Sequence, residues 1–332
     1  MKCKLSDICN FRKGKIGVSN LTLKTYISTE NMLPNKGGIT EASSLPTAQL
    51  TQEYKKGDVL VSNIRPYFKK IWLARHDGGC SNDVLVFQGN SNIDGDFFYY
   101  VLANDDFFAY SMATSKGTKM PRGDKTSIMQ YEVPIFDIDT QRKIASVLRS
   151  LDEKIELNSA INNNLEQQMQ AIFNAFFLTF DLHTYSTYME TEYGRIPSNW
   201  QFMELGNANL DISDGNYSSK YPKQNEFLSS GIPFIRGTDF NGTSISQSDM
   251  LYISPEKHSE LKKGHTKRGD ILITTRGEIG RIAFVPDSLV DVNINSQLVR
   301  INGSNIVPRS YLACYLTSTK VQNDFKTLTY FL

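Results

Sequence analysis

The sequence predicts an α+β fold with two tandem domains of mixed β-sheet and helices, joined by a long heptad-bearing α-helix. Three observations predict it: an internal repeat, short strand-like runs in each copy of the repeat, and apolar residues at helical spacing between the copies. The length of 332 residues is sufficient for two domains and a connector.

The internal repeat is the strongest of these signals. Residues 55–61 read KKGDVLV and residues 267–273 read KRGDILI. In each copy an arginine follows, then a basic residue leading into an apolar run, a strand containing asparagine, and an aromatic helix. The offset stays near 211–214 through these elements, being 212 for Asp58 and Asp270, which indicates a tandem duplication. A duplicated unit is expected to perform one task twice, at two places on a partner.

Domain boundaries follow from changes of pattern along the chain. Short apolar or alternating runs bounded by Gly, Pro, Asn and Asp predict the strands of each domain. We assign residues 1–137 to the first domain, 138–180 to a long spacer helix, 181–200 to a polar linker, and 201–332 to the second domain.

The repeat also supports three finer expectations. Residues 97–113 are expected to form one aromatic helix, and residues 202–205 are expected to match residues 2–5 at the start of the first domain. Projection of the first copy onto the second places Leu332 near Thr118. The second domain is therefore expected to be incomplete, without its final part and without a second spacer helix.

The spacer helix is predicted by apolar or small polar residues that recur every three or four positions. Asp139 or Thr140 is expected to cap its N-terminus, and its length is about 60 Å. An isolated stripe of this kind is not stable in water, so it needs a partner; the alternative is an ordinary helix packed on its own domain. The expected seam comprises Ile144, Leu148, Leu151, Ile155, Asn158, Asn162, Leu165, Met169, Ile172 and Phe176.

Positive charge is local in this chain. The net charge is only +1, but basic residues are concentrated in residues 55–75 and 262–281, which are equivalent in the repeat, and in residues 116–125. A solvated face is the ordinary explanation of any one such cluster. Recurrence in both copies favours a surface that faces phosphates.

Several kinds of site are not expected. The four cysteines have no paired spacing and the four histidines no ligand spacing, so neither a disulfide framework nor a metal site is predicted, and the cysteines suit a reducing cytoplasm. No apolar run is long enough to cross a membrane. The sequence has no phosphate-binding P-loop, no GxSxG elbow and no methyltransferase motif, so we expect no catalytic residues.

Three further motifs occur in a fixed order. GTKMPRGDK at 117–125 precedes YEVPIFDIDTQRKIASVLRSLDEKIE at 131–156, and GRIPSNWQFMELG at 194–206 opens the second domain. Together with GDVLV and GDILI in the middle of each domain, this order resembles the specificity subunit of type I restriction–modification systems. The resemblance extends over the whole chain.

The resemblance implies two target-recognition domains, each reading one half of a bipartite site in double-stranded DNA, with the helix setting their spacing. In the family, two such helices pair antiparallel and dock methyltransferase (M) subunits, which bind S-adenosylmethionine and flip the target base. A restriction motor-nuclease (R) subunit uses ATP and Mg. This chain would then be a non-catalytic, cytoplasmic subunit without a cofactor of its own. Without a second helix, its seam would be covered by a partner subunit or by self-association.

Candidate DNA contacts are basic, polar and aromatic residues of the loops. Lysines position a protein on phosphates, whereas the planar guanidinium can grip guanine, so Arg65, Arg122 and Arg276 are the base-reading candidates. Asp58 and Asp270 are instead expected to form turns. The full set comprises Asn63, Arg65, Tyr67, Lys69, Lys70, Lys116, Lys119 and Arg122 in the first domain, and Asn216, Tyr217, Arg236, Thr275, Arg276 and Arg281 in the second.

Two other classes stay open from the residues alone. One is a non-catalytic coiled-coil scaffold whose two β-rich modules bind protein or carbohydrate, and the other is an enzyme such as a fused restriction nuclease. A specificity subunit should bind DNA with a steep salt dependence once its partner is present, and a scaffold should not.

Overall fold

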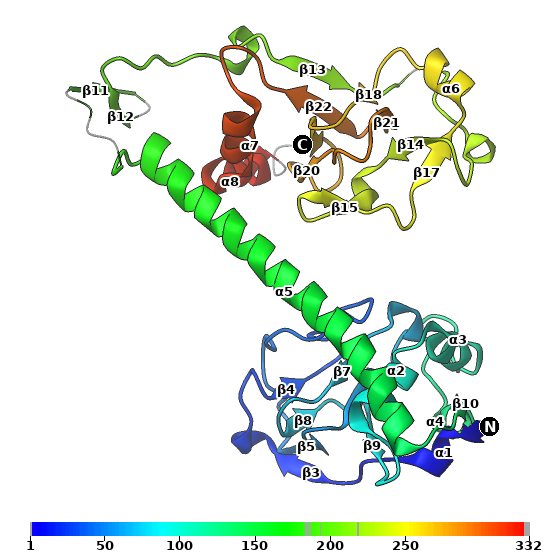
Figure 1. Cartoon of the computed structure of the whole chain (residues 1–332). Helices are drawn as coiled ribbons and strands as arrows, with labels where there is room; N and C mark the ends of the chain where they lie inside the picture. The colour runs from blue at the N-terminus through cyan, green and yellow to red at the C-terminus, as the bar shows by residue number, and fades with distance from the viewer. Residues whose placement is uncertain (1, 183–184, 186, 193, 218, 329–332) are drawn as a thin grey trace. The chain divides into compact units, whose positions relative to one another are not determined.

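The computed structural model describes residues 2–182, 185, 187–192, 194–217 and 219–328. The chain divides into two compact units, Met1–Ala160 and Ile161–Leu332, and the division falls inside α5 (Ile138–Phe177), one continuous helix of 40 residues (Figure 1). Among the described residues, no helix has both the length and the apolar character that a membrane crossing requires.

Two four-stranded sheets form the centre of the first unit. Across one sheet the antiparallel strands are β2 (Cys9–Phe11), β9 (Val84–Gly89), β6 (Val59–Ser62) and β7 (Ile71–Leu73). Across the other they are β3 (Lys15–Gly17), β5 (Leu50–Tyr54), β8 (Gly78–Cys80) and β4 (Tyr26–Ile27), with β4 parallel to β8. Outside the sheets lie β1 (Lys2–Lys4) paired with β10 (Glu132–Pro134), the helices α1 (Leu5–Ile8), α2 (Gly95–Leu102), α3 (Asp105–Ala113) and α4 (Lys125–Ile128), and the 3₁₀ turns η1 (Val18–Asn20) and η2 (Pro66–Phe68).

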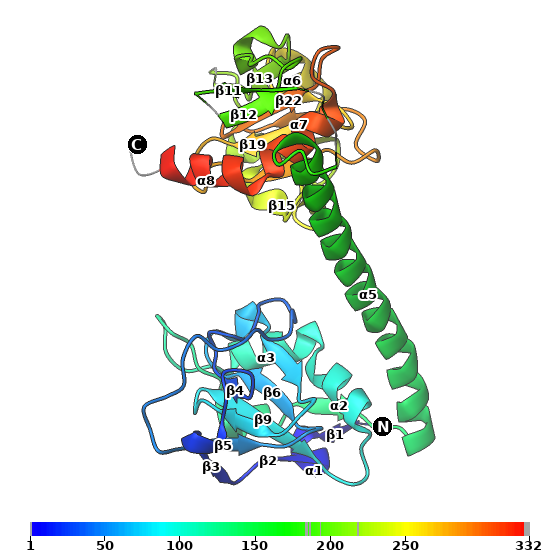
Figure 2. The same ribbon diagram turned by 90° about the vertical axis from the view of Figure 1, so that its left-hand side faces the viewer.

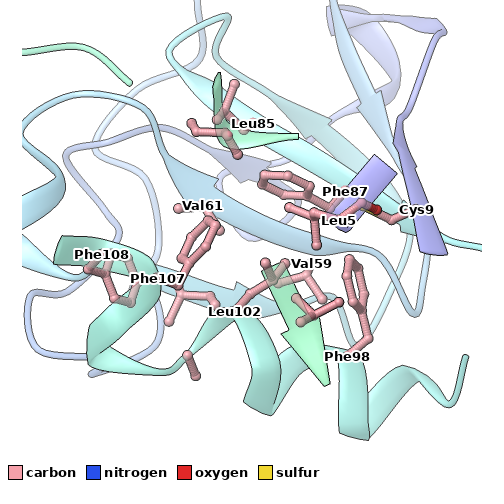
Figure 3. Packing of buried hydrophobic residues seen from close by; sticks show 14 of the residues in the cluster. Leu5, Cys9, Val59, Val61, Leu85, Phe87, Phe98, Leu102, Phe107 and Phe108 are labelled. Atoms are coloured by element: carbon pink, nitrogen blue, oxygen red, sulfur yellow. The ribbon is translucent and has the colours of Figure 1, made fainter. Parts of the chain in front are cut away.

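The core of this unit explains why β6 is apolar at every position. Val59 and Val61 pack with Phe98 and Leu102 of α2 (Figure 3), whereas Leu60 packs into a separate cluster with residues of β4 and β8. Successive side chains of a strand point to opposite faces, and here both faces are buried. The first unit is therefore a helix layer, a sheet and a second sheet.

The second unit has the same plan. One antiparallel sheet contains β13 (Asp211–Asp214), β22 (Leu298–Asn302), β19 (Ile271–Thr274) and β20 (Ile282–Phe284). The other contains β17 (Leu251–Ile253), β14 (Ile232–Ile235), β21 (Val292–Ile294) and β18 (His265–Thr266), with β14 parallel to β21. The remaining elements are β15 (Phe240–Asn241) and β16 (Ser244–Ile245), helices α6 (Pro255–Glu260), α7 (Arg309–Thr317) and α8 (Thr319–Leu328), and 3₁₀ turns η3 (Leu205–Asn207), η4 (Gln224–Glu226) and η5 (Gly237–Asp239).

The two topologies confirm the predicted duplication. The order β2-β9-β6-β7 in the first unit corresponds strand for strand to β13-β22-β19-β20 in the second. In the other sheet, β5-β8-β4 corresponds to β18-β21-β14, including the single parallel pair. Helices α7 and α8 cover β19 and β22 (Figure 2), as α2 and α3 cover β6 and β9. The copies differ at the outer strand of this second sheet, β3 in one and β17 in the other.

The repeated Gly-Asp pairs are structural, as expected. Gly57 and Gly269 have φ of 92° and 80°, a conformation that favours glycine. The carboxylates that follow are buried: Asp58 accepts a bond from the Lys55 amide at 2.8 Å, and Asp270 accepts one from the amide three residues before it at 3.0 Å. Each pair closes the tight turn that starts β6 or β19.

The structure corrects three local expectations. Residues 97–113 form two helices, because the Asn104 side chain accepts from the Asp106 amide and starts α3 anew. Asp137, and neither Asp139 nor Thr140, caps α5: its carboxylate accepts from the amide and the hydroxyl of Thr140. The helix ends at Phe177 rather than at residue 180.

Two segments after α5 also differ from expectation. The polar linker, residues 181–200, contains a hairpin of β11 (Tyr188–Thr191) and β12 (Gly194–Pro197). Residues 202–205 match residues 2–5 only in the turn at Leu205 that starts η3, since no strand covers the three positions before it. In the first unit β1 is held by β10, whereas within residues 219–328 no strand is equivalent to β10.

Each end of α5 packs on one unit through residues outside the predicted seam. Near its start, Ala145 is buried, Gln141 accepts from the Asp94 amide at 2.8 Å, and Tyr100 donates to Asp152 at 2.7 Å. Near its end, buried Phe173 lies 5.3 Å from the Tyr311 ring, and Gln170 donates to Thr317 at 2.7 Å. These polar anchors include glutamine and aspartate, which an apolar pattern does not detect.

Candidate nucleic-acid interface

The loop between β6 and β7, residues 63–70, carries five of the eight candidates of the first unit. Two of them, Arg65 and Lys69, have φ of 51°, a left-handed conformation that is uncommon outside glycine. They flank η2, whose first residue is Pro66. Such strained positions persist only where surrounding contacts hold them, and they often occur in functional loops.

Two other loops hold this segment in place. The amides of Asn35 and Lys36 donate to the carbonyls of Phe68 and Lys69 at 2.8 and 2.9 Å. The Arg65 amide donates to the Pro121 carbonyl at 2.8 Å. We call residues 34–37, 63–70 and 116–123 the first loop cluster. The sequence analysis missed residues 34–37, although their Pro-Asn-Lys-Gly composition is typical of a turn.

The contact between loops 63–70 and 116–123 is close. Lys116 and Arg122 exchange two backbone hydrogen bonds of 2.9 Å, and the Gly123 amide donates to the Asn63 carbonyl at 3.1 Å. A Cβ at Gly123 would lie 2.9 Å from Asn63 Oδ1, so a larger residue would separate the loops. Candidates more than 50 positions apart in the sequence are thereby brought together.

Two buried polar atoms of this cluster have no hydrogen-bond partner among the described residues: Asn63 Oδ1 and Arg65 Nε. Buried polar groups are normally satisfied, and an exception requires an explanation. Both atoms belong to residues proposed from the sequence to contact a ligand. A polar group of a bound ligand would supply the missing hydrogen bonds.

The exposed side chains of the cluster combine aromatic and basic groups. Tyr67 and Phe68 lie with ring centroids 4.6 Å apart, and both are more than a third exposed. Exposed Lys119 has no ion pair among the described residues, whereas Arg122 pairs with Asp83 at 3.1 Å. The three other candidate lysines are paired or bonded: Lys116 with Asp124 at 2.8 Å, Lys69 with Asp105 at 3.0 Å, and Lys70 with the Thr29 carbonyl at 2.6 Å.

These ion pairs shift the pKa of the carboxyl groups. The hydrogen bond from Lys116, with further bonds from Ser127, lowers the pKa of Asp124 from 3.8 to about 2. Bonds from Lys36 and then Lys69 lower the pKa of Asp105. Pairs of this kind on a surface contribute little to stability. The cations can therefore exchange a carboxylate for a phosphate without a large loss.

A polar cavity of about 450 Å³ borders this cluster, since Thr29 and Asp83 line it. Glu30 and Glu41 also line it. Its carboxylates make the cavity unsuitable for a phosphate group, so the candidate DNA contacts lie on the loops.

The second unit has an equivalent loop between β19 and β20, residues 275–281. The Thr275 amide donates to the Gln297 carbonyl at 2.8 Å, just as the Asn63 amide donates to the Asp83 backbone carbonyl in the first unit. The exposed Arg276 guanidinium lies 5.5 Å from the ring of Tyr217, which follows β13. We call residues 215–217 and 275–281 the second loop cluster.

Three other candidates of the second unit have side chains that are buried or bonded inside the chain, so they are less available to contact a ligand. Asn216 is buried. The Arg236 guanidinium pairs with Asp239 at 2.6 Å and donates to the Asp249 carbonyl at 2.8 Å. Arg281 donates to the carbonyls of Gly237 and Phe240. The guanidinium groups of Arg236 and Arg281 therefore stabilise the η5 segment by internal bonds.

The predicted seam of α5 is largely exposed. Leu151 is 54%, Ile155 63% and Leu165 56% exposed, and the seam asparagines Asn158 and Asn162 are exposed as well. Leu148, Met169 and Ile172 are also exposed, whereas Ile144 and Phe176 are half-buried. The alternative that the helix is covered by its own domain thus fails along the middle of the seam. Exposed apolar rows of this kind are typical of interaction surfaces.

These features define a class: a duplicated two-unit protein with a basic, aromatic loop cluster in each unit and a bridging helix with an exposed apolar seam. Residues 1–167 match the family described as the type I restriction modification DNA specificity domain. The chain belongs to this family.

Curated relatives carry the same description. The chain is 33% identical over 165 residues to the type I restriction enzyme HindI specificity subunit of Haemophilus influenzae, covering 47% of this chain and 36% of that protein. It is 26% identical over 227 residues to the MjaIX specificity subunit of Methanocaldococcus jannaschii, covering 64% of this chain and 51% of that protein. The matches thus span about a third to a half of the length of these relatives.

One solved structure supports the fold. The S subunit of a type I restriction-modification system from M. genitalium superimposes with a TM-score of 0.55 at 18% identity, covering 98% of this chain and 78% of that chain. At this identity the similarity concerns the fold alone.

Proposed function

We propose that this chain is the DNA-recognition subunit of a type I restriction–modification complex, in which each loop cluster reads one half of a bipartite site. The observation that carries the proposal is the equivalent placement of Arg65 and Arg276, each on the hairpin loop after the repeated Gly-Asp strand. The exposed Tyr67 follows Arg65 by two residues, and the Arg276 guanidinium lies 5.5 Å from the ring of the exposed Tyr217. Family membership supplies the class of partner.

The candidates divide into roles according to what their side chains already contact. Arg65, Arg122 and Arg276 are proposed to read base edges, because a guanidinium can donate two bonds to guanine. Lys69, Lys70, Lys116 and Lys119 are proposed to position the first unit on phosphates. Arg236 and Arg281 are proposed to stabilise the loops of the second unit rather than to contact DNA, since their N–H donors are used in internal hydrogen bonds.

The exposed seam of α5 is proposed to dock the methyltransferase subunits, and the helix to set the spacing between the half-sites. Burial of leucine and isoleucine on docking supplies the driving force. S-adenosylmethionine, ATP and Mg would be held by the methyltransferase and motor-nuclease subunits, and this chain would contribute specificity without catalysis in the cytoplasm. Pairing of the seam with a second copy of this chain is the competing arrangement.

The test is to co-express the chain with the methyltransferase subunit of the same system and to purify the complex. DNA binding should weaken steeply with rising salt, and mapping of modified bases should show a two-part sequence with a constant gap. A complex whose DNA binding does not change between low and high salt would support the scaffold alternative instead. Nuclease activity of the purified chain alone would support the enzyme alternative.

A further inference from the structure

Two of the four histidines come together in the second unit, although the sequence shows no ligand spacing between them. His258 lies on α6 and His265 begins β18, and their ring centroids are 4.2 Å apart. Asp291 immediately precedes β21, and its carboxylate lies 3.1 Å from His258 Nε2. One nitrogen of each ring and one Asp291 oxygen all lie within 4.8 Å of one another.

Hydrogen bonds set the tautomer of both rings. His258 Nδ1 is bonded to the side-chain oxygen of Asn293, and His265 Nε2 is bonded to the Leu261 carbonyl. Each acceptor oxygen requires the N–H of the ring, so His258 Nε2, which faces Asp291, and His265 Nδ1 are the nitrogens available to bind an ion. Histidines that bind metal ions have this arrangement, with the second ring N–H donated to an amide or carbonyl oxygen.

Burial distinguishes this cluster from a surface group of titratable residues. His258 and Asn293 are buried, His265 is half-buried, and Asp291 is exposed. The hydrogen-bond acceptors therefore sit in the interior, while the aspartate leaves one side open to solvent. That combination provides rigid ligands and an entry path.

We propose that His258, His265 and Asp291 bind one divalent transition-metal ion, Zn²⁺ in preference to Mg²⁺ or Ca²⁺. Imidazole nitrogen suits zinc, whereas magnesium and calcium prefer oxygen ligands. Three protein ligands leave the fourth position of a tetrahedral ion to water. The bound ion joins α6, β18 and the start of β21.

The site has a structural consequence inside the second unit. Strand β18 is only two residues long and lies at the edge of its sheet, where His265 pairs with Asn293 of β21. A metal ion bound by His265 of β18 and by Asp291, which precedes β21, would hold the short strand on the sheet. The first unit has no corresponding histidine pair, since its described histidine, His76, contacts Tyr54 and the Asp77 carbonyl. The inference therefore concerns one copy of the repeat.

The test measures metal binding on the purified chain without DNA, so that its outcome is independent of the proposed function. The protein is stripped with a chelator, dialysed and titrated with Co²⁺, whose visible absorption reports tetrahedral nitrogen and oxygen ligands, and then with Zn²⁺ in competition. We expect one equivalent of tight binding and a higher unfolding temperature with Zn²⁺. Mg²⁺ should produce neither effect.

Variants decide whether these residues hold the ion. Asp291→Asn and His265→Gln should each weaken binding by at least about tenfold and remove the thermal shift. Asp287→Asn, an exposed aspartate of the same loop region, is the matched control and should bind as the native chain does. Circular dichroism without metal should show that both site variants are folded. Binding that is absent from the native chain, or equal in Asp291→Asn, would overturn the proposal in favour of a plain His258–Asp291 ion pair.

Discussion

At the residue scale, the loop clusters are held by backbone hydrogen bonds more than by side chains. Arg65 and Lys69 adopt left-handed conformations that cost about 1–3 kcal/mol each. The amides and carbonyls of residues 34–37 and 116–123 offset this cost by bonding the strained segment directly. The loops are thus ordered before any ligand binds, which reduces the entropy that binding must overcome.

Removal of a buried carboxylate tests the repeated turn. Asp58 forms an ion pair with Arg12, in which Arg12 Nη2 lies 2.9 Å from Asp58 Oδ1, and it accepts the Lys55 amide. Asp58→Ala leaves both groups without a partner and should destabilise the first unit by about 3–5 kcal/mol. Urea unfolding monitored by circular dichroism measures the change. Asp77→Ala removes only exposed interactions, an ion pair with Lys55 and a bond from the Lys56 amide, and should change the unfolding midpoint little.

The pKa of Asp124 gives a pH prediction. Its folded value of about 2 lies below the ordinary 3.8, so its stabilising contribution is present above pH 3.8 and is lost as the pH falls through about 2. Loop 116–123 should therefore remain bonded to α4 at mildly acidic pH and loosen only in strong acid. Amide shifts of Ser127 during an NMR titration report this transition. In Asp124→Asn the same resonances should show no transition in that range.

At the element scale, α5 has separate residues for three tasks. Gln141 and Ala145 anchor its start, Gln170 and Phe173 anchor its end, and the seam between them remains exposed. A helix whose apolar row is not used by its own chain needs another surface to cover it. Assembly and folding are therefore separable by mutation.

Leu151→Asp and Leu165→Asp should each abolish co-purification of the methyltransferase subunit, because a charge would be buried without a partner. Both leucines are more than half exposed in this chain, so the units themselves should fold normally. Size-exclusion chromatography and circular dichroism measure the two properties. Asn163→Asp places the same charge on the helix outside the seam and should retain the complex. An intact complex with both leucine variants would refute docking through the seam.

At the scale of the whole molecule, duplication predicts that the two halves of a target are read independently. Arg65→Ala and Arg276→Ala should relax different halves of the target sequence, each by about 1–3 kcal/mol of discrimination. Because the two loop clusters belong to different units, the double variant should combine the two effects. Methylation-site profiling of the assembled complex measures each half separately. Arg75→Ala, outside the clusters, serves as the control, and an unchanged preference in Arg65→Ala would contradict the assignment.

Much of the architecture could be predicted because it depends on local pattern. The repeat, the apolar strands and the 3–4 spacing of α5 are properties of consecutive residues, and the strand orders agree with the duplication. The prediction of a single helix over 97–113 was wrong because one side-chain cap at Asn104 outweighed a continuous aromatic pattern. The N-cap of α5 was misplaced by two or three residues for a similar reason.

The sequence by itself determined that the chain contains one unit twice, with a long amphipathic helix and basic loops at equivalent positions, since periodicity and composition act over a few neighbouring residues. Only the tertiary structure decided which loops meet, which arginines bond inside the second unit, that the seam stays exposed, and that His258 and His265 lie close to Asp291. Those facts depend on contacts between residues far apart in the chain. Such contacts follow from how strands pair and layers pack, and they leave no spacing rule in the sequence.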